Sequence, residues 1–186
     1  MQVLDAIRNR RSIKRFTNRP VSREEIEAVL DAAVLAPNHR LTLPWRFHVL
    51  GPEARHAYGL AVGDGKARKL TDPDAMIALR NSLAAEHRAL PCMIAVAVVT
   101  HENPEIREED YAAVMMGIQN LALAAVELGL GTHIKTGAVM TTAAARAAVG
   151  VPENQRIVAT INLGEPADPP PARPGRPARE HTAWLP

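Results

Sequence analysis

The stretch "CMIAVAVVT", residues 92 to 100, constrains the fold more than any other part of the chain. It is short, rich in β-branched residues and apolar on both faces of an extended strand, which is typical of a central strand covered on both sides. Aromatic residues make up only 3% of the chain, so the core around this strand is built from Ala, Leu, Val, Ile and Met. Such a core suits packed helices.

Helical and strand-like patterns alternate around this segment. One helix is predicted from a capping box, Ser22 followed by Glu25, up to the break at Pro37. Other helices are predicted over residues 2–9, 53–63, 73–87, 111–131 and 141–150, and strands over 45–50, 92–100, 131–135 and 155–164. We therefore predict an α+β fold, a mixed central sheet flanked by helices.

The length of 186 residues suits one domain with a sizeable core and is short for two. We predict a single domain over 1–186, with a proline-rich extension from about 165. The apolar segment 111–131 is interrupted by Gln119, Asn120 and Glu127, which favours a helix buried on most sides over a transmembrane helix. The N-terminus lacks the apolar core of a secretory signal, so we expect a cytoplasmic protein.

Two polar segments are predicted as loops. The segment "GDGKARKLTDPD", residues 63–74, carries glycines and charges, and we expect it to be mobile, as a lid could be. The segment "HENPEIREED", residues 101–110, is predicted as a charged loop leading into the long helix.

Charge and metal-binding residues restrict the classes of function. With 22 cations against 20 anions, the chain is too balanced to coat a nucleic acid as a whole, so any anion site is local. Few aromatic side chains are available for base stacking, which disfavours a basic nucleic-acid-binding module. Cys92 is the only cysteine and is interpreted as a buried structural thiol, and the seven histidines show no metal-ligand spacing, so we predict no metal.

The stretch "RNRRSIKRF", residues 8–16, places five cations around Ser12 at the end of the first predicted helix. Like charges this dense repel one another unless solvent or an anion offsets them. One interpretation is a solvated corner in which cations favour a helix C-terminus. The other is a phosphate site, because guanidinium groups and a hydroxyl supply the donors that a phosphate needs.

Four segments, in order and spacing, resemble the nitroreductase family of flavoproteins: "RRSIKRF" (10–16), "APNHRLTLPWRFHVL" (36–50), "GLGTHIKTG" (129–137) and "INLGEP" (161–166). The resemblance covers almost the whole chain and is closest to the minimal-length bacterial members. It implies an intertwined homodimer with FMN at the subunit interface.

The resemblance also implies roles for the cationic stretch. Arg10, Arg11 and Ser12 match positions that bind the phosphate and ribityl chain of FMN. Lys14 matches the position near the pyrimidine edge of the isoalloxazine. A cation there would stabilise the negative charge that builds at N1 and O2 on reduction, so Lys14 is the expected catalytic residue.

The other segments imply further cofactor contacts. Leu35 and His39 match positions that contact the flavin of the partner subunit, and a neutral imidazole can both donate and accept a hydrogen bond. Lys135 would add a charge for the phosphate, and Thr136 and Gly137 would offer hydroxyl and backbone donors. Two positions depart from the family pattern.

Those departures concern residues beside the flavin. Leu43 stands where many members have a polar residue, and Ile134 stands at a cofactor-contacting position where some close relatives have an aromatic residue. A side-chain amide contact from position 43 is therefore unavailable. Stacking on the ring at position 134 is also not expected.

The implied function is an FMN-dependent oxidoreductase that takes hydride from NADH or NADPH and reduces nitroaromatics, quinones or activated alkenes with ping-pong kinetics. The alternative is a flavin-binding protein of the same fold without this turnover, for flavin storage, flavin fragmentation or dehalogenation. The sequence leaves the preferred nicotinamide donor and the physiological acceptor open.

The proline-rich tail raises two further questions. Its cations Arg173, Arg176 and Arg179 could approach the phosphate. The tail could instead wrap a neighbouring subunit, which would explain why a segment without predicted structure carries Trp184 and Leu185.

Overall fold

A computed structural model describes residues 2–168, 170–171, 175 and 177–186. The strands are β1 (Trp45–Val49), β2 (Cys92–Val99), β3 (Gly131–Lys135) and β4 (Gln155–Gly164). The helices are α1 (Val3–Asn9), α2 (Arg23–Val34), α3 (Pro52–Ala67), α4 (Pro73–Arg88), α5 (Pro104–Glu127) and α6 (Ala143–Val149). Two short 3-10 turns complete the described elements, η1 (Ala138–Thr141) and η2 (Ala178–His181).

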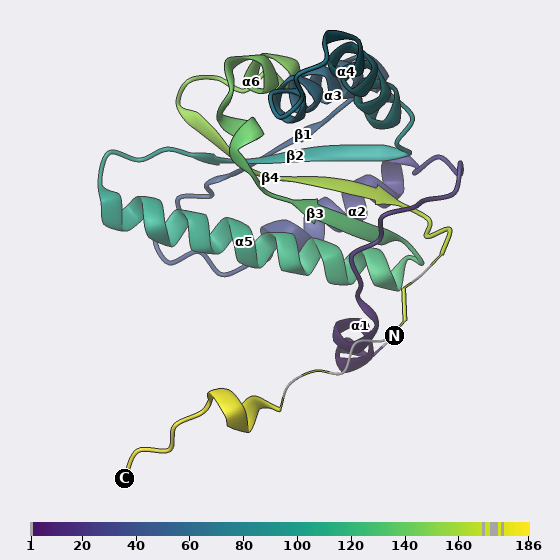
Figure 1. The fold of residues 1–186 in the computed structure, drawn as a ribbon. Coiled ribbons are helices and arrows are strands. Elements are labelled where there is room, and N and C mark those ends of the chain that lie inside the picture. Colours follow the sequence, from purple (N-terminus) through teal and green to yellow (C-terminus); the bar gives the residue numbers. More distant parts are fainter. Residues whose placement is uncertain (1, 169, 172–174, 176) are drawn as a thin grey trace.

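The four strands form one sheet in the order β1-β2-β4-β3, with helices on both faces (Figure 1). α3, α4 and α6 lie over one face, and α2 and α5 lie over the other. All pairs of named strands are antiparallel. Outside these strands, Ser12 forms one isolated parallel bridge with Thr132 of β3. The predicted α+β architecture is confirmed.

Strand β2 is the interior strand that the apolar run predicts. Its residues from Cys92 to Val98 are all buried. Ile94 and Val96 join the core on the α2 and α5 side, whereas Met93 and Ala95 join the core beneath α3 and α6. Alternate side chains of one strand therefore fill both layers, as a two-sided strand requires.

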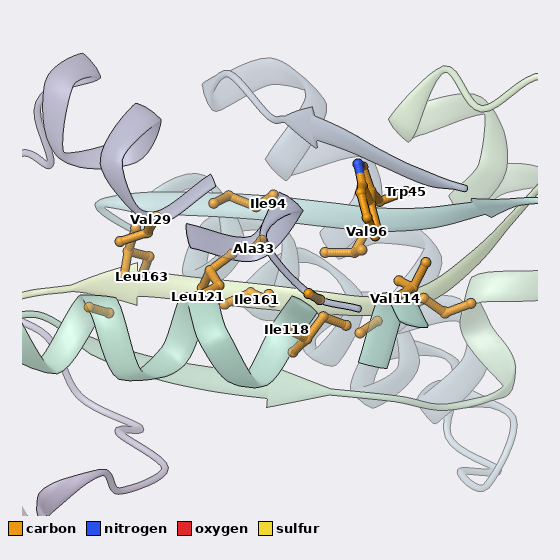
Figure 2. Packing of buried hydrophobic residues seen from close by; sticks show 14 of the residues in the cluster. Val29, Ala33, Trp45, Ile94, Val96, Val114, Ile118, Leu121, Ile161 and Leu163 are labelled. Atoms are coloured by element: carbon orange, nitrogen blue, oxygen red, sulfur yellow. The ribbon is translucent and has the colours of Figure 1, made fainter. Parts of the chain in front are cut away.

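Figure 2 shows the larger of these cores, in which side chains from the sheet meet those of α2 and α5. Val29 and Leu121 are fully buried and lie close to the strand residue Leu163. α5 is thus buried along one side, and Met116 on it stays exposed. Among the described residues, no helix combines the length and apolarity needed to cross a membrane.

The predicted helix boundaries at Ser22 and Gly150 are confirmed. The Ser22 hydroxyl accepts a hydrogen bond from the backbone N–H of Glu25, and the Glu25 carboxylate accepts one from the backbone N–H of Ser22. Gly150 ends α6 in the left-handed region, with φ of 74°.

The expected loop and lid over residues 63–74 are largely wrong, because α3 continues to Ala67 and α4 begins at Pro73. The glycines that suggested a loop permit close helix packing instead. A Cβ atom at Gly63 would lie 2.6 Å from the Cα of Arg80 on α4. The Arg80 side chain also reaches back to Asp64, with Nε 2.7 Å from Oδ1. Tertiary packing therefore outweighs the low helix propensity of glycine here.

The predicted charged loop over residues 101–110 is also too long. α5 begins at Pro104, and the side chain of Asn103 caps it by accepting a hydrogen bond from the N–H of Glu105. The first turns of α5 are charged because most of their residues face solvent. From the sequence alone, such an exposed charged helix could not be distinguished from a charged loop.

The contact between α3 and α4 predicts opposite effects for two glycines on α3. A Cβ at Gly59 would lie 2.7 Å from both Ala84 Cα and Leu83 O, whereas a Cβ at Gly65 would meet nothing within 4 Å. Gly59→Ala should lower the free energy of unfolding by about 1–3 kcal/mol through overpacking. Gly65→Ala, the matched control, should leave it unchanged or raise it by up to about 1 kcal/mol. Urea denaturation measures both, and equal effects would contradict the packing described.

Candidate functional site

The cationic stretch follows α1 as an extended segment along the outer edge of β3. Ile13 donates a backbone hydrogen bond to the carbonyl of Thr132 at 2.9 Å. Its side chain is buried against Gly131, where a Cβ atom would lie only 2.3 Å from Ile13 Cγ1. Because side chains alternate along an extended segment, Ser12 and Lys14 are left exposed on either side of the buried Ile13.

A first pocket, here called the cationic pocket, opens beside this segment. It is lined by Ile7, Arg8, Arg10, Arg11, Ser12, Lys14, Arg15, Asp168, Pro170 and Gly175. Arg15 forms an ion pair with Asp168. Arg11 Nη1 donates to the carbonyls of Arg8 at 2.5 Å and Arg10 at 2.8 Å, which fixes the guanidinium at the rim.

Several donors of the cationic pocket have no protein partner. Within the described part of the chain, the side chains of Arg10, Ser12 and Lys14 make no hydrogen bond or ion pair. Two cations of the pocket are paired with carboxylates, Arg8 with Asp5 and Arg15 with Asp168. The pocket therefore presents positive charge and free donors to an anion.

A second pocket lies where the end of α4 meets β3 and β4, and it is called the α4-side pocket. Its lining comprises Lys14, Phe16, Thr17, Asn18, Glu86, His87, Ala89, Leu90, Pro91, His133, Lys135 and Asn162. Lys14 is the residue that lines both pockets. The two pockets are thus neighbours, with Lys14 between them.

Burial and nearby cations shape the titration of the α4-side pocket. Burial, followed by the charges of Lys135 and Lys14, lowers the pKa of His133. Burial also lowers the pKa of His87, although its hydrogen bond to the carbonyl of Leu83 opposes the shift. Both imidazoles are therefore neutral at pH 7.

Lys135 is the half-buried cation of the α4-side pocket. Burial, with a smaller contribution from Lys66, lowers the pKa of its ammonium group, and the charge of Glu86 acts in the opposite direction. The family resemblance assigns Lys135 to the phosphate. In the structure Lys135 lines the α4-side pocket with His133 and Asn162, whereas Arg10 and Arg11 line the cationic pocket.

The expected site residues on and after β3 separate in space. Ile134 packs its side chain into the core on the α2 and α5 side, so the α4-side pocket is formed by its neighbours instead. Thr136 and Gly137 follow the strand directly and are exposed, and Gly137 has a φ of 152°.

Leu35 and His39 lie elsewhere in the single chain, on the loop after α2. Neither lines either pocket. His39 Nδ1 is 3.0 Å from Glu109 Oε1 on α5. Leu35 is 81% exposed, at the C-terminal end of α2.

Polar side chains hold this loop in a strained form. Leu41 and Leu43 have positive φ angles of 51° and 47°. Asn38 Oδ1 accepts the Leu43 N–H at 2.8 Å, and Thr42 bonds to the buried carboxylate of Asp110. The loop is therefore rigid, and it presents leucine side chains to the outside.

The arginines of the C-terminal tail do not line either pocket or lie outside the described residues. Arg179 is exposed on η2 and lines neither pocket, and Arg173 and Arg176 lie outside the described residues. In the described ranges, no group of three His, Cys, Asp or Glu side chains is arranged to hold a metal ion.

Asn162, His133, His87 and Glu86 line the α4-side pocket but were not identified as site residues from the sequence. The signal for Asn162 was present, because it is an amide residue in the largely apolar strand segment "IVATINLG", whose other polar residue is Thr160. The histidines gave no such signal. Their proximity to Lys14 depends on how α4 and β3 meet.

Comparisons with known proteins bear on this arrangement. The sequence profile of the nitroreductase family matches residues 7–165. "Putative NAD(P)H nitroreductase YfhC" of Bacillus subtilis is 33% identical over 179 residues, which are 95% of this chain and 90% of that protein.

Solved structures share the fold. A nitroreductase-like family protein from Bacillus cereus superposes with a TM-score of 0.85 and 27% identity, covering 100% of this chain and 96% of the other. The FMN and NADPH-dependent nitroreductase NfnB from Sphigopyxis sp. strain HMH superposes with a TM-score of 0.78 and 21% identity, covering 100% and 99%. The family profile and the relatives match the chain over most of its length. The chain therefore belongs to the nitroreductase family, whose general chemistry is that of an oxidoreductase.

Proposed function

We propose that the protein is an FMN-dependent NAD(P)H oxidoreductase, with the FMN phosphate in the cationic pocket and its ring toward the α4-side pocket. The observation that supports this most is Lys14, which lines both pockets at once. An elongated ligand with an anionic end and a polar ring would contact both. NfnB, which shares the fold, is described as dependent on FMN and NADPH.

The donors of the two pockets fit the two ends of FMN. Arg10, Arg11 and Ser12 offer charge-assisted and neutral hydrogen bonds of the kind that a phosphate and a ribityl chain accept. In the α4-side pocket, Asn162 carries a buried side-chain oxygen without a partner among the described residues. Such groups suit a ring whose edge alternates carbonyl oxygens and N–H donors.

The mechanism assigns each residue a simple task. When bound, FMN supplies a ring that accepts hydride from a nicotinamide and passes electrons to an acceptor. With FMN bound, Lys14 would stabilise negative charge on the pyrimidine edge, and Lys135 would add a second positive charge in the same pocket. Thr136 and Gly137 offer donors at the end of β3. No side chain needs to donate a proton in the half-reaction with nicotinamide.

Donor and acceptor would use the same open site in turn, which gives ping-pong kinetics. Flat electrophiles such as nitroaromatics, quinones and activated alkenes are the proposed acceptors. Either NADH or NADPH would serve as donor. The lone Cys92 is buried, and burial raises its pKa to about 11, as expected for an unreactive structural thiol. The proposed enzyme is a single domain that works in the cytoplasm.

A homodimer would complete this site. Leu35 and His39 lie away from the pockets of their own chain, on a rigid loop with exposed leucines, so they could act on the pockets of a second copy. α1 carries the exposed residues Val3, Leu4 and Ile7. The segment with η2 lies apart from the layered body (Figure 1), and Trp184 on it is 91% exposed. Such apolar surface favours association.

The homodimer predicts the effect of a charge on α1. Light scattering after size exclusion should give twice the chain mass of 20.1 kDa for the unaltered protein. Leu4→Asp should weaken the dimer, because it places a charge on exposed apolar surface that a partner would bury. Ile77→Asp, an equally exposed apolar site on α4, is the matched control and should leave the mass unchanged. A monomeric mass for the unaltered protein would refute the dimer.

The function predicts that bound FMN is reduced by a nicotinamide and that Lys14 sets the rate. After reconstitution with FMN and desalting, the protein should keep the visible flavin absorption and lose it under nitrogen when NADH or NADPH is added. Lys14→Met should lower the rate of this bleaching about 10-fold or more while changing FMN affinity less, since the charge matters most as the ring is reduced. Stopped-flow absorption measures the rate.

Each other outcome has a distinct meaning. Retained flavin that neither nucleotide reduces would favour a flavin-binding protein for storage, fragmentation or dehalogenation. An unchanged reduction rate in Lys14→Met would remove the catalytic role of Lys14. If no flavin is retained, the cationic stretch is better interpreted as a solvated corner than as a phosphate site.

A further inference from the structure

Asn162 is a polar residue near the C-terminal end of β4, on the face of the sheet that lines the α4-side pocket. It is only 4% exposed, and it lines the α4-side pocket. Its neighbours along β4, Ile161 and Leu163, turn to the opposite face and are fully buried in the core. The strand therefore directs the carboxamide of Asn162 to the pocket. An apolar side chain at this position would pack equally well.

The carboxamide is incompletely bonded. Its Oδ1 atom is buried and has no hydrogen-bond partner among the described residues. Leaving a buried acceptor unpaired costs free energy, so a ligand that donates a hydrogen bond to Oδ1 would gain affinity from this atom. The terminal torsion of asparagine is soft, so either end of the carboxamide can turn toward the pocket.

The surroundings of Asn162 indicate the chemistry of that partner. His133 lies directly opposite on β3 and is neutral, because burial and the nearby lysines lower its pKa. Lys14 and Lys135 line the same pocket. The pocket thus combines two cations with an amide and an imidazole that can each donate and accept. A ligand edge with several acceptors and at least one donor would satisfy this set.

We infer that Asn162 recognises the pyrimidine edge of the flavin, by exchanging hydrogen bonds with its imide N–H and an adjacent carbonyl, with His133 beside it. This inference rests on the proposed function. It adds a specificity-determining residue that neither the sequence motifs nor the cationic pocket identified. A carboxamide matches an imide because both present a donor next to an acceptor.

The inference predicts opposite effects of Asn162→Leu on the free and the bound protein. Leucine has a similar branched shape without polar atoms, so the FMN-free protein should be at least as stable in urea denaturation. The dissociation constant for FMN, measured by quenching of flavin fluorescence, should rise about 10-fold through the lost hydrogen bonds. Asn81→Leu, at an exposed position on α4 outside the pocket, is the matched control and should change neither value.

A modified cofactor tests the contact directly. FMN methylated at N3 lacks the imide N–H, so the unaltered protein should bind it about 10-fold more weakly than FMN. Asn162→Leu should bind the two compounds equally. Full discrimination retained in Asn162→Leu would overturn the inference while leaving FMN binding intact. Failure of the unaltered protein to bind FMN at all would overturn the proposed function as well.

Discussion

The backbone hydrogen bond between Ile13 and Thr132 holds the cationic segment against the edge of β3, and the candidate site depends on it. Gly131 makes the approach possible, because any side chain there would occupy the space of Ile13. Burial of Ile13 then leaves Ser12 and Lys14 exposed. The backbone of Lys14 is thereby held between the two pockets, and its side chain lines both.

The sheet divides its tasks between its two faces. Toward α2 and α5 the strands present apolar side chains, including Ile134, Ile161 and Leu163, and this side provides most of the core. Toward α4 the same strands present Lys135, His133 and Asn162. Because side chains alternate along a strand, one short segment can stabilise the fold and line the site together.

Local signals in the sequence predicted much of the fold. The capping box at Ser22 and the two-sided apolar run of β2 specify their elements through nearby residues, and both are confirmed. The segment 63–74 was predicted wrongly because Gly63 is helical only by virtue of its contact with Arg80 on another helix. No local pattern contains that contact.

The candidate site also contains residues that local sequence predicts and residues that only packing brings together. The cationic residues and Lys14 lie in one stretch of sequence, so their clustering was predictable. Asn162 and His87 come together only when β4 and α4 pack, and a single polar residue in a strand is weak evidence of a site. Leu35 and His39 are the extreme case, since their proposed role needs a second copy of the chain.

Binding of the FMN phosphate by the cationic pocket is central to the proposed function. The most direct test compares the dissociation constants of FMN and riboflavin, which differ only in that phosphate, by quenching of flavin fluorescence. Charge-assisted bonds from Arg10, Arg11 and Ser12 should make FMN bind at least about 10-fold more tightly, and the difference should shrink as salt is added. Equal affinities for the two flavins would contradict the account.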